Sequence, residues 1–128
     1  MEPGQIPPKA DGLSRLVKAF FYSLAGVRSV FKTEAAFRQE VFVLPATTFL
    51  AWWLPLDMFW SLWLTFGAVF FLLLELINTA LERLVDLASP GYHLLAKEAK
   101  DIGSALVLIG MGFYGLLWVL AAYSLWQH

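Results

Sequence analysis

Four polar residues with helical spacing interrupt an otherwise apolar stretch: Glu75, Asn78, Glu82 and Asp86. On an α-helix these positions fall within about 80° of one another, so the four side chains would form one polar ridge. Residues 58–74, which precede the ridge, contain no charged side chain. A carboxylate beside such a segment is unfavourable in a membrane unless it faces a polar cavity or a partner. Glu75 is therefore a candidate proton acceptor or metal-facing carboxylate, whereas Asp86 could equally be a solvated helix end.

Two more polar clusters flank this ridge in the sequence. The first runs from Glu34 to Glu40, and the second opens with Lys100 and Asp101. Helix packing could bring all three clusters to one layer, although a Lys–Asp pair is also common at the start of a helix. Paired carboxylates suit a hard cation such as Mg²⁺ that is shared with phosphate oxygens. The residues alone predict a carboxylate site in a membrane protein, either metal-dependent or proton-carrying, and leave the substrate open.

Motifs of other chemistries do not occur in the sequence. Cysteine is absent, and His93 and His128 are the only histidines, which argues against a zinc site. The chain has no GxxxxGKS or GxxxxGKT phosphate loop and no HExxH motif. Its formal net charge of −1 gives no reason to expect a nucleic-acid partner.

The elements that must position these residues are predicted to be membrane helices. The hydrophobic share is 59%, against about 45–50% in soluble domains. Residues 12–128 are expected to form one all-α domain after a proline-rich, disordered tail at residues 1–11. Residues 12–33 carry apolar side chains at spacings of three and four with basic residues between them, which predicts an amphipathic surface helix. The expected transmembrane helices cover about residues 36–55, 58–83 and 101–126.

The distribution of basic residues predicts the orientation in the membrane. All nine Lys and Arg residues either precede Val41 or lie between Arg83 and Lys100. Because cytoplasmic segments are enriched in Lys and Arg, both basic segments are expected in the cytoplasm. With three spans, the amino terminus is then cytoplasmic and the carboxyl terminus lies on the other side. Tryptophans such as Trp52 and Trp126 would form an aromatic belt there.

Three segments together resemble the prokaryotic integral-membrane diacylglycerol kinase family. They are Glu34-Ala-Ala-Phe-Arg-Gln-Glu40, Glu75-Leu-Ile-Asn-Thr-Ala-Leu-Glu82 followed by Asp86, and Ala99-Lys-Asp-Ile-Gly-Ser-Ala105. The resemblance extends from about Arg15 to the carboxyl end. It implies a homotrimer in the bacterial inner membrane, each subunit with a surface helix, three spans and a periplasmic carboxyl terminus. It also implies transfer of the γ-phosphoryl group of MgATP to the hydroxyl of diacylglycerol, at composite sites formed where subunits meet.

The resemblance also implies roles for individual residues. Glu75 matches the general base, with Asn78, Lys100 and Asp101 as further catalytic residues, and Glu34 and Glu82 match the ligands of Mg²⁺. The residues implied to contact the nucleotide are Arg15, Tyr22, Glu34, Glu82, Gly91, Tyr92, His93, Lys100 and Asp101. Those implied to face the lipid are Ala36, Phe37, Arg38, Gln39, Glu40, Glu75 and Ser104.

Several alternatives compete with this interpretation. The form of residues 34–40 and 103–105 favours the diacylglycerol branch over a branch that phosphorylates undecaprenol by the same mechanism. A non-enzymatic proton- or cation-conducting protein would need polar residues along a whole transmembrane path. The outer half of the second expected span offers only Ser61 and Thr65 for such a path. A purely structural membrane subunit would leave Glu75 unexplained.

Overall fold

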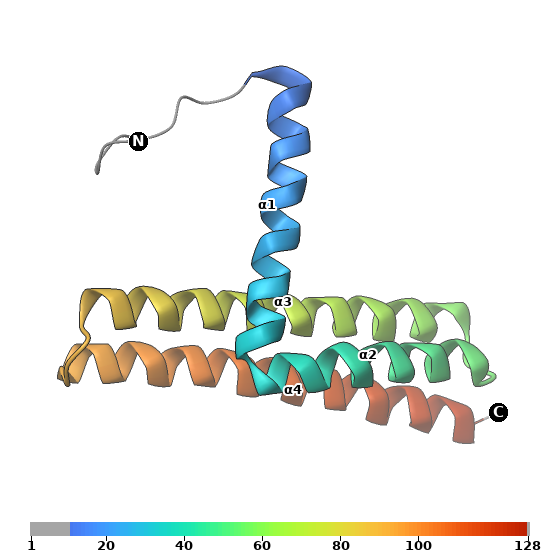
Figure 1. Cartoon of the computed structure of the whole chain (residues 1–128). Coiled ribbons are helices and arrows are strands. Elements are labelled where there is room, and N and C mark those ends of the chain that lie inside the picture. The colour runs from blue at the N-terminus through green and yellow to red at the C-terminus, as the bar shows by residue number, and fades with distance from the viewer. Residues whose placement is uncertain (1–10, 128) are drawn as a thin grey trace.

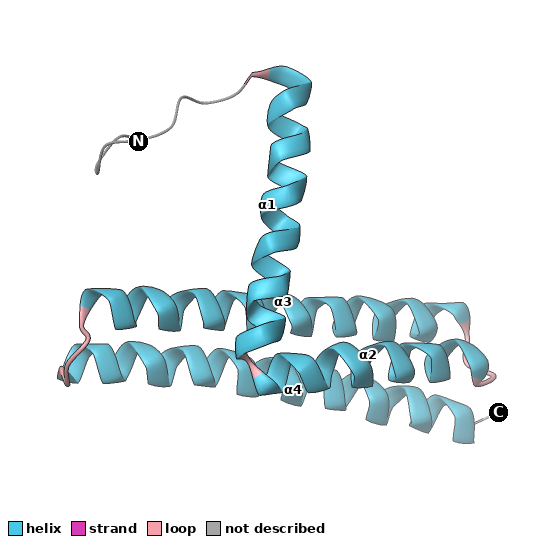
Figure 2. Ribbon diagram, viewed as in Figure 1, coloured by secondary structure: helices cyan, strands magenta, loops and turns pink. Residues whose placement is uncertain are grey.

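The computed structural model describes residues 11–127 as helices joined by short loops (Figure 1 and Figure 2). The described part of the chain contains four helices and no strand, which confirms the predicted all-α class. The helices are α1 (Gly12–Thr33), α2 (Ala35–Trp53), α3 (Met58–Ala88) and α4 (Leu94–Trp126). Apart from Asp11, the predicted disordered tail at residues 1–11 lies outside the described residues.

Among the described helices, α3 and α4 are the two that are long and apolar enough to cross a membrane. Their 31 and 33 residues correspond to about 46 and 50 Å, against about 30 Å of hydrocarbon in a bilayer. Both helices are therefore longer than the hydrocarbon core, and α4 as a helix begins at Leu94, before the span predicted from about residue 101. The 19 residues of α2 include Arg38, Glu40 and Pro45, which lower its apolar character.

Helices α2, α3 and α4 run side by side, whereas α1 lies across them and contacts α2 and α3 with its C-terminal part (Figure 1). The chain changes direction at Glu34, whose backbone is extended and whose N–H donates to the Val30 carbonyl at 2.8 Å. Arg38 Nη1 then donates to the carbonyls of Phe31 and Lys32, at 3.0 Å each. Because the last carbonyls of a helix lack intrahelical partners, the Arg38 side chain stabilises the end of α1.

Glycine allows α3 and α4 to approach each other at two points. A Cβ atom at Gly103 would overlap the side chain of Asn78, and one at Gly110 would overlap a leucine of α3. At Gly112 and Gly115 an added Cβ would have no neighbour within 4 Å. Of the four glycines of α4, Gly103 and Gly110 therefore permit close approach within this chain.

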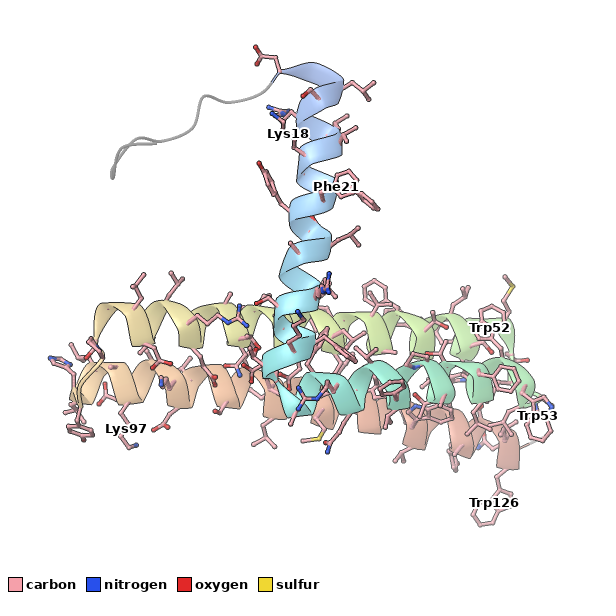
Figure 3. All side chains as sticks on the ribbon, in the orientation of Figure 1. Lys18, Phe21, Trp52, Trp53, Lys97 and Trp126 are labelled. Carbon is pink, nitrogen blue, oxygen red and sulfur yellow. The ribbon has the colours of Figure 1, made fainter. Side chains whose placement is uncertain are left out.

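The outer faces of the helices carry large apolar side chains. Phe49 and Ile109, for example, are each 72% exposed. Trp52, Trp53 and Trp126 lie toward one end of the bundle, and Lys97 lies toward the other (Figure 3). So much exposed apolar surface exceeds what isolated soluble domains carry, and lipid or protein must cover it.

Candidate functional site

The polar ridge predicted from the sequence lies along the second half of α3. Glu75 is buried, with 8% of its surface exposed, Asn78 and Glu82 are half-buried, and Asp86 is exposed. The helical period therefore places the carboxylates at increasing exposure toward the α3–α4 loop. This gradient separates one enclosed carboxyl group from others that a water-soluble ligand can reach.

The enclosed end of the ridge contains a second carboxyl group, which comes from α2. The carboxyl group of Glu40 faces that of Glu75 at hydrogen-bonding range. Glu40 Oε2 is shielded from solvent and has no hydrogen-bond partner among the described residues. Two helices that are distant in sequence thus bring two acidic side chains together in an apolar bundle.

Asn78 lies in the contact between α3 and α4. Its Nδ2 donates to Glu82 Oε1 at 3.3 Å, and its Oδ1 is shielded, without a hydrogen-bond partner, against Gly103 of α4. The absence of a side chain at Gly103 is what leaves space for the amide. Asn78 therefore links the buried and the accessible carboxylates of the ridge.

A pocket of about 300 Å³ lies where α3 ends and α4 begins. Lys100 Nζ is 2.5 Å from Asp86 Oδ1, and Lys97 Nζ is 2.6 Å from Asp101 Oδ2. The hydrogen bond to Asp86, together with the charge of that carboxylate, raises the pKa of Lys100, so its ammonium group stays charged. The polar residues around this pocket are Asp86, Ser89, Tyr92, His93, Lys97, Lys100 and Asp101, with Gly91 in the loop.

The two adjacent residues Lys100 and Asp101, both implied to be catalytic, do not pair with each other in this pocket. Asp101 binds Lys97, and Lys100 binds Asp86. The reason is helical geometry, because residues four apart on α4 share a face whereas adjacent residues diverge by about 100°. Asp86 and Lys97, which were not among the expected site residues, thus belong to this pocket; only the position of Asp86 on the ridge signalled it.

Glu34 lies at the junction of α1 and α2, where several polar contacts meet. Its Oε1 accepts a hydrogen bond from Thr33 at 3.2 Å. Arg83 Nη2 donates to the same Thr33 hydroxyl at 2.9 Å, and Arg83 Nη1 donates to Ser29 at 3.0 Å. Glu34 and Glu82, the expected metal ligands, therefore make their hydrogen bonds to different partners, Thr33 and Asn78.

The remaining expected residues are distributed unevenly. Phe37 is buried, with 3% exposed, and Arg38 is engaged with the end of α1, so neither presents its side chain as an open lipid contact. Exposed side chains are found at Ala36 and Gln39 of α2, at Ser104 of α4, and at Arg15 and Tyr22 of α1. The N-terminal part of α1, which carries Arg15 and Tyr22, extends away from the bundle (Figure 1).

Comparison with known proteins gives consistent results. The sequence model of a family described as prokaryotic diacylglycerol kinase matches residues 21–122. A diacylglycerol kinase of Helicobacter pylori (strain ATCC 700392 / 26695) is 41% identical over 119 residues, which are 92% of this chain and 92% of that protein. The diacylglycerol kinase of Escherichia coli (strain K12) is 36% identical over 91% of this chain and 93% of that protein. The diacylglycerol kinase of Pseudomonas aeruginosa is 36% identical over 84% of this chain and 87% of that protein.

Proposed function

The chain belongs to the prokaryotic diacylglycerol kinase family, and from this premise we propose that it transfers the γ-phosphoryl group of ATP to the hydroxyl of diacylglycerol, giving phosphatidic acid. The family match over residues 21–122 is the observation that carries this conclusion. It also confirms the resemblance inferred from the three sequence segments.

We propose that α1 is a surface helix and that α2, α3 and α4 each cross the bacterial inner membrane. The crosswise direction of α1 at the start of α2 supports this arrangement, because a helix perpendicular to the spans lies in the plane of the headgroups (Figure 1). The 19 residues of α2 correspond to about 28 Å, close to the hydrocarbon thickness. The parts of α3 and α4 that extend past α1, with their charged residues, would then project into the cytoplasm, with the carboxyl terminus in the periplasm.

Glu75 is proposed as the general base. It is buried and lies beside Glu40 in the first half of α2, and we propose that the hydroxyl of a membrane lipid reaches it beneath the headgroups. A base must reach the proton that it removes by a direct hydrogen bond or through one water molecule. Asn78, one turn further along α3, would hold the accessible carboxylate Glu82 by its amide hydrogen bond at 3.3 Å. Ala36, Gln39 and Ser104 have the exposed side chains expected of residues that face the lipid.

The pocket between α3 and α4 is proposed to receive the triphosphate of ATP. Lys100 provides the positive charge that stabilises the phosphoryl oxygens as negative charge redistributes during transfer. In this chain alone its ammonium group is held by Asp86, so phosphate binding would compete with that carboxylate. Gly91, Tyr92 and His93 line the same pocket and are proposed nucleotide contacts.

Glu34 and Glu82 are proposed to hold Mg²⁺. Both offer hard carboxylate oxygens, and no group of three or more potential His, Cys, Asp or Glu ligands is clustered among residues 11–127. This donor set fits Mg²⁺, which typically takes one or two carboxylates and completes its shell with substrate phosphates and water. When bound, the ion would neutralise phosphate charge and orient the γ-phosphoryl group for in-line transfer.

We propose a homotrimer with composite sites because a single chain leaves an apolar groove uncovered and two expected nucleotide contacts away from its own pocket. An apolar groove of about 660 Å³ lies between α1 and α3, lined by residues that include Val27, Leu76 and Leu84. The N-terminal part of α1, which carries Arg15 and Tyr22, extends away from the bundle of its own chain (Figure 1), so these two residues are proposed to contact a nucleotide bound by another subunit. Neighbouring subunits would also bring the two proposed metal ligands to one site.

The experiment that tests the function is phosphate transfer from radiolabelled ATP in mixed micelles. Diacylglycerol and undecaprenol are offered separately as acceptors, with Mg²⁺ present or chelated. We expect metal-dependent labelling of phosphatidic acid, well above that of undecaprenyl phosphate. Undecaprenyl phosphate as the main product would keep the reaction and reverse the substrate, and no labelling of either lipid by folded protein would refute the kinase function.

The matching test of the base is Glu75→Gln, which replaces a proton acceptor by an amide of the same shape. Removal of a general base typically lowers the rate by about 10²–10⁴-fold. We expect this loss in kcat while nucleotide binding is retained. Substantial turnover by the purified variant would remove Glu75 from this role.

A further inference from the structure

We propose that Glu40 is a positioning residue for Glu75: its protonated carboxyl group donates the hydrogen bond that holds the Glu75 carboxylate toward the lipid hydroxyl. This inference deepens the proposed function and rests on it, because Glu75 is the base only if the chain is a lipid kinase. It assigns to Glu40 a role different from that of a general lipid contact.

The geometry that carries this inference is the meeting of α2 and α3. The carboxyl groups of Glu40 and Glu75 face each other, one from each helix. Glu40 Oε2 is shielded from solvent, and Glu75 has 8% of its surface exposed. Glu75 and the Oε2 atom of Glu40 are therefore shielded from water, and each carboxyl group is the polar partner available to the other.

No cation neutralises this pair among the described residues. Arg38, two positions before Glu40, donates to the carbonyl groups at the end of α1. Arg83 donates to Ser29 and Thr33, and Lys100 binds Asp86. Glu75 is the ionisable group that acts on Glu40, and neither ion pair of the described residues includes Glu40 or Glu75.

Two ionised carboxylates placed side by side in a partly buried site repel each other. A single proton between them converts this repulsion into a charge-assisted hydrogen bond, which is the strongest kind available to a carboxylate. No other side chain among residues 11–127 donates a hydrogen bond to Glu75. Glu40 is thus the group that can fix the direction of the base.

During transfer the proton of Glu40 stays where it is. Glu75 accepts the proton of the lipid hydroxyl while that oxygen forms a bond to the γ-phosphorus and the bond from phosphorus to the bridging oxygen of ADP breaks. The proton taken by Glu75 then leaves to water. Because Glu40 neither gains nor loses a proton, an uncharged hydrogen-bond donor of similar shape can replace it.

This property gives a test with two substitutions at one position. Glu40→Met keeps the length of the side chain but removes the donor, and we expect kcat to fall about 10–100-fold with the KM for diacylglycerol changed less than about twofold. Glu40→Gln offers an amide N–H and should recover kcat to within about fivefold of the unmodified protein. Glu98→Gln, which removes an exposed carboxylate of α4, is the matched control and should leave kcat unchanged. Thermal unfolding of each purified variant in detergent shows that the fold is intact.

Two outcomes would overturn the inference. If Glu40→Gln is as inactive as Glu40→Met, a carboxylate is required, and Glu40 is a ligand of metal or substrate. If Glu40→Met raises KM rather than lowering kcat, Glu40 contacts the lipid directly. A Glu40→Met variant too unstable to purify leaves Glu40→Gln to decide, because strong turnover by that variant excludes a required carboxylate and weak turnover excludes the donor role.

A double variant separates this inference from the proposed function. If Glu40 acts through Glu75, then Glu40→Met adds no further loss in a Glu75→Gln background, whereas an independent role would make the two losses multiply. If the unmodified protein phosphorylates no lipid, the proposed function itself fails. If it is active and Glu75→Gln is inactive, only the response to the Glu40 substitutions decides the positioning role.

Discussion

Replacing Gly103 by alanine tests whether the contact between α3 and α4 holds Asn78 in place for catalysis. An added Cβ atom would overlap Asn78 Oδ1 and lie 3.3 Å from Leu81 Cδ2. The amide nitrogen of Asn78 is bonded to Glu82 at 3.3 Å, so the amide cannot move away without weakening that hydrogen bond. The substitution therefore disturbs Asn78 and Glu82 of the polar ridge, although Gly103 itself has no reactive side chain.

The size of the effect follows from two opposing contributions. Overpacking by one methyl group costs about 1–3 kcal/mol in a close contact, whereas alanine is favoured over glycine in a helix by about 1 kcal/mol. The free energy of unfolding should therefore fall by only about 0–2 kcal/mol. A displacement of about 1 Å in an active site can lower the rate 10²-fold, so we expect kcat to fall about 10–100-fold.

The assay is the initial rate of phosphatidic acid formation in mixed micelles, with stability followed by thermal unfolding in detergent. Gly112→Ala is the matched control, because an added Cβ there has no neighbour within 4 Å. It should retain kcat and stability. A Gly103→Ala protein that is folded and turns over at the rate of the unmodified protein would refute the role of this contact.

Three further predictions concern charge, metal and packing. Lys100→Met should lower kcat by at least about 100-fold, because the positive charge that stabilises the phosphate is lost. Lys32→Met, which removes an exposed lysine of α1, is the control and should change kcat little. Equal losses in the two variants would exclude a specific role for Lys100. Glu82→Gln should raise the Mg²⁺ concentration for half-maximal activity by about tenfold or more, and an unchanged metal titration would count against a ligand role. Tyr114→Phe removes a hydroxyl that lies 2.8 Å from the Thr47 hydroxyl, and should lower the free energy of unfolding by about 0.5–1.5 kcal/mol at constant kcat. A loss of the same size in a Thr47→Val background would show that this hydrogen bond does not stabilise the fold.

Much of the fold could be predicted from the sequence because its causes are local. The helical period places Glu75, Asn78 and Glu82 on one face of any helix that forms there, whatever surrounds it. The long apolar segments that became α3 and α4 predict membrane helices for the same reason, since hydrophobicity and length are properties of a segment. The three polar segments, taken in order, also sufficed to indicate the family.

Only the tertiary structure decides which side chains meet between helices. Whether Glu40 faces Glu75, or Asp86 rather than Asp101 reaches Lys100, depends on the rotation and register of one helix against another. Those are fixed by packing over many residues, such as the close approach at Gly103, and not by the period of either helix. The sequence by itself determined which residues could carry the chemistry, and the packing of the helices determined the partner of each one.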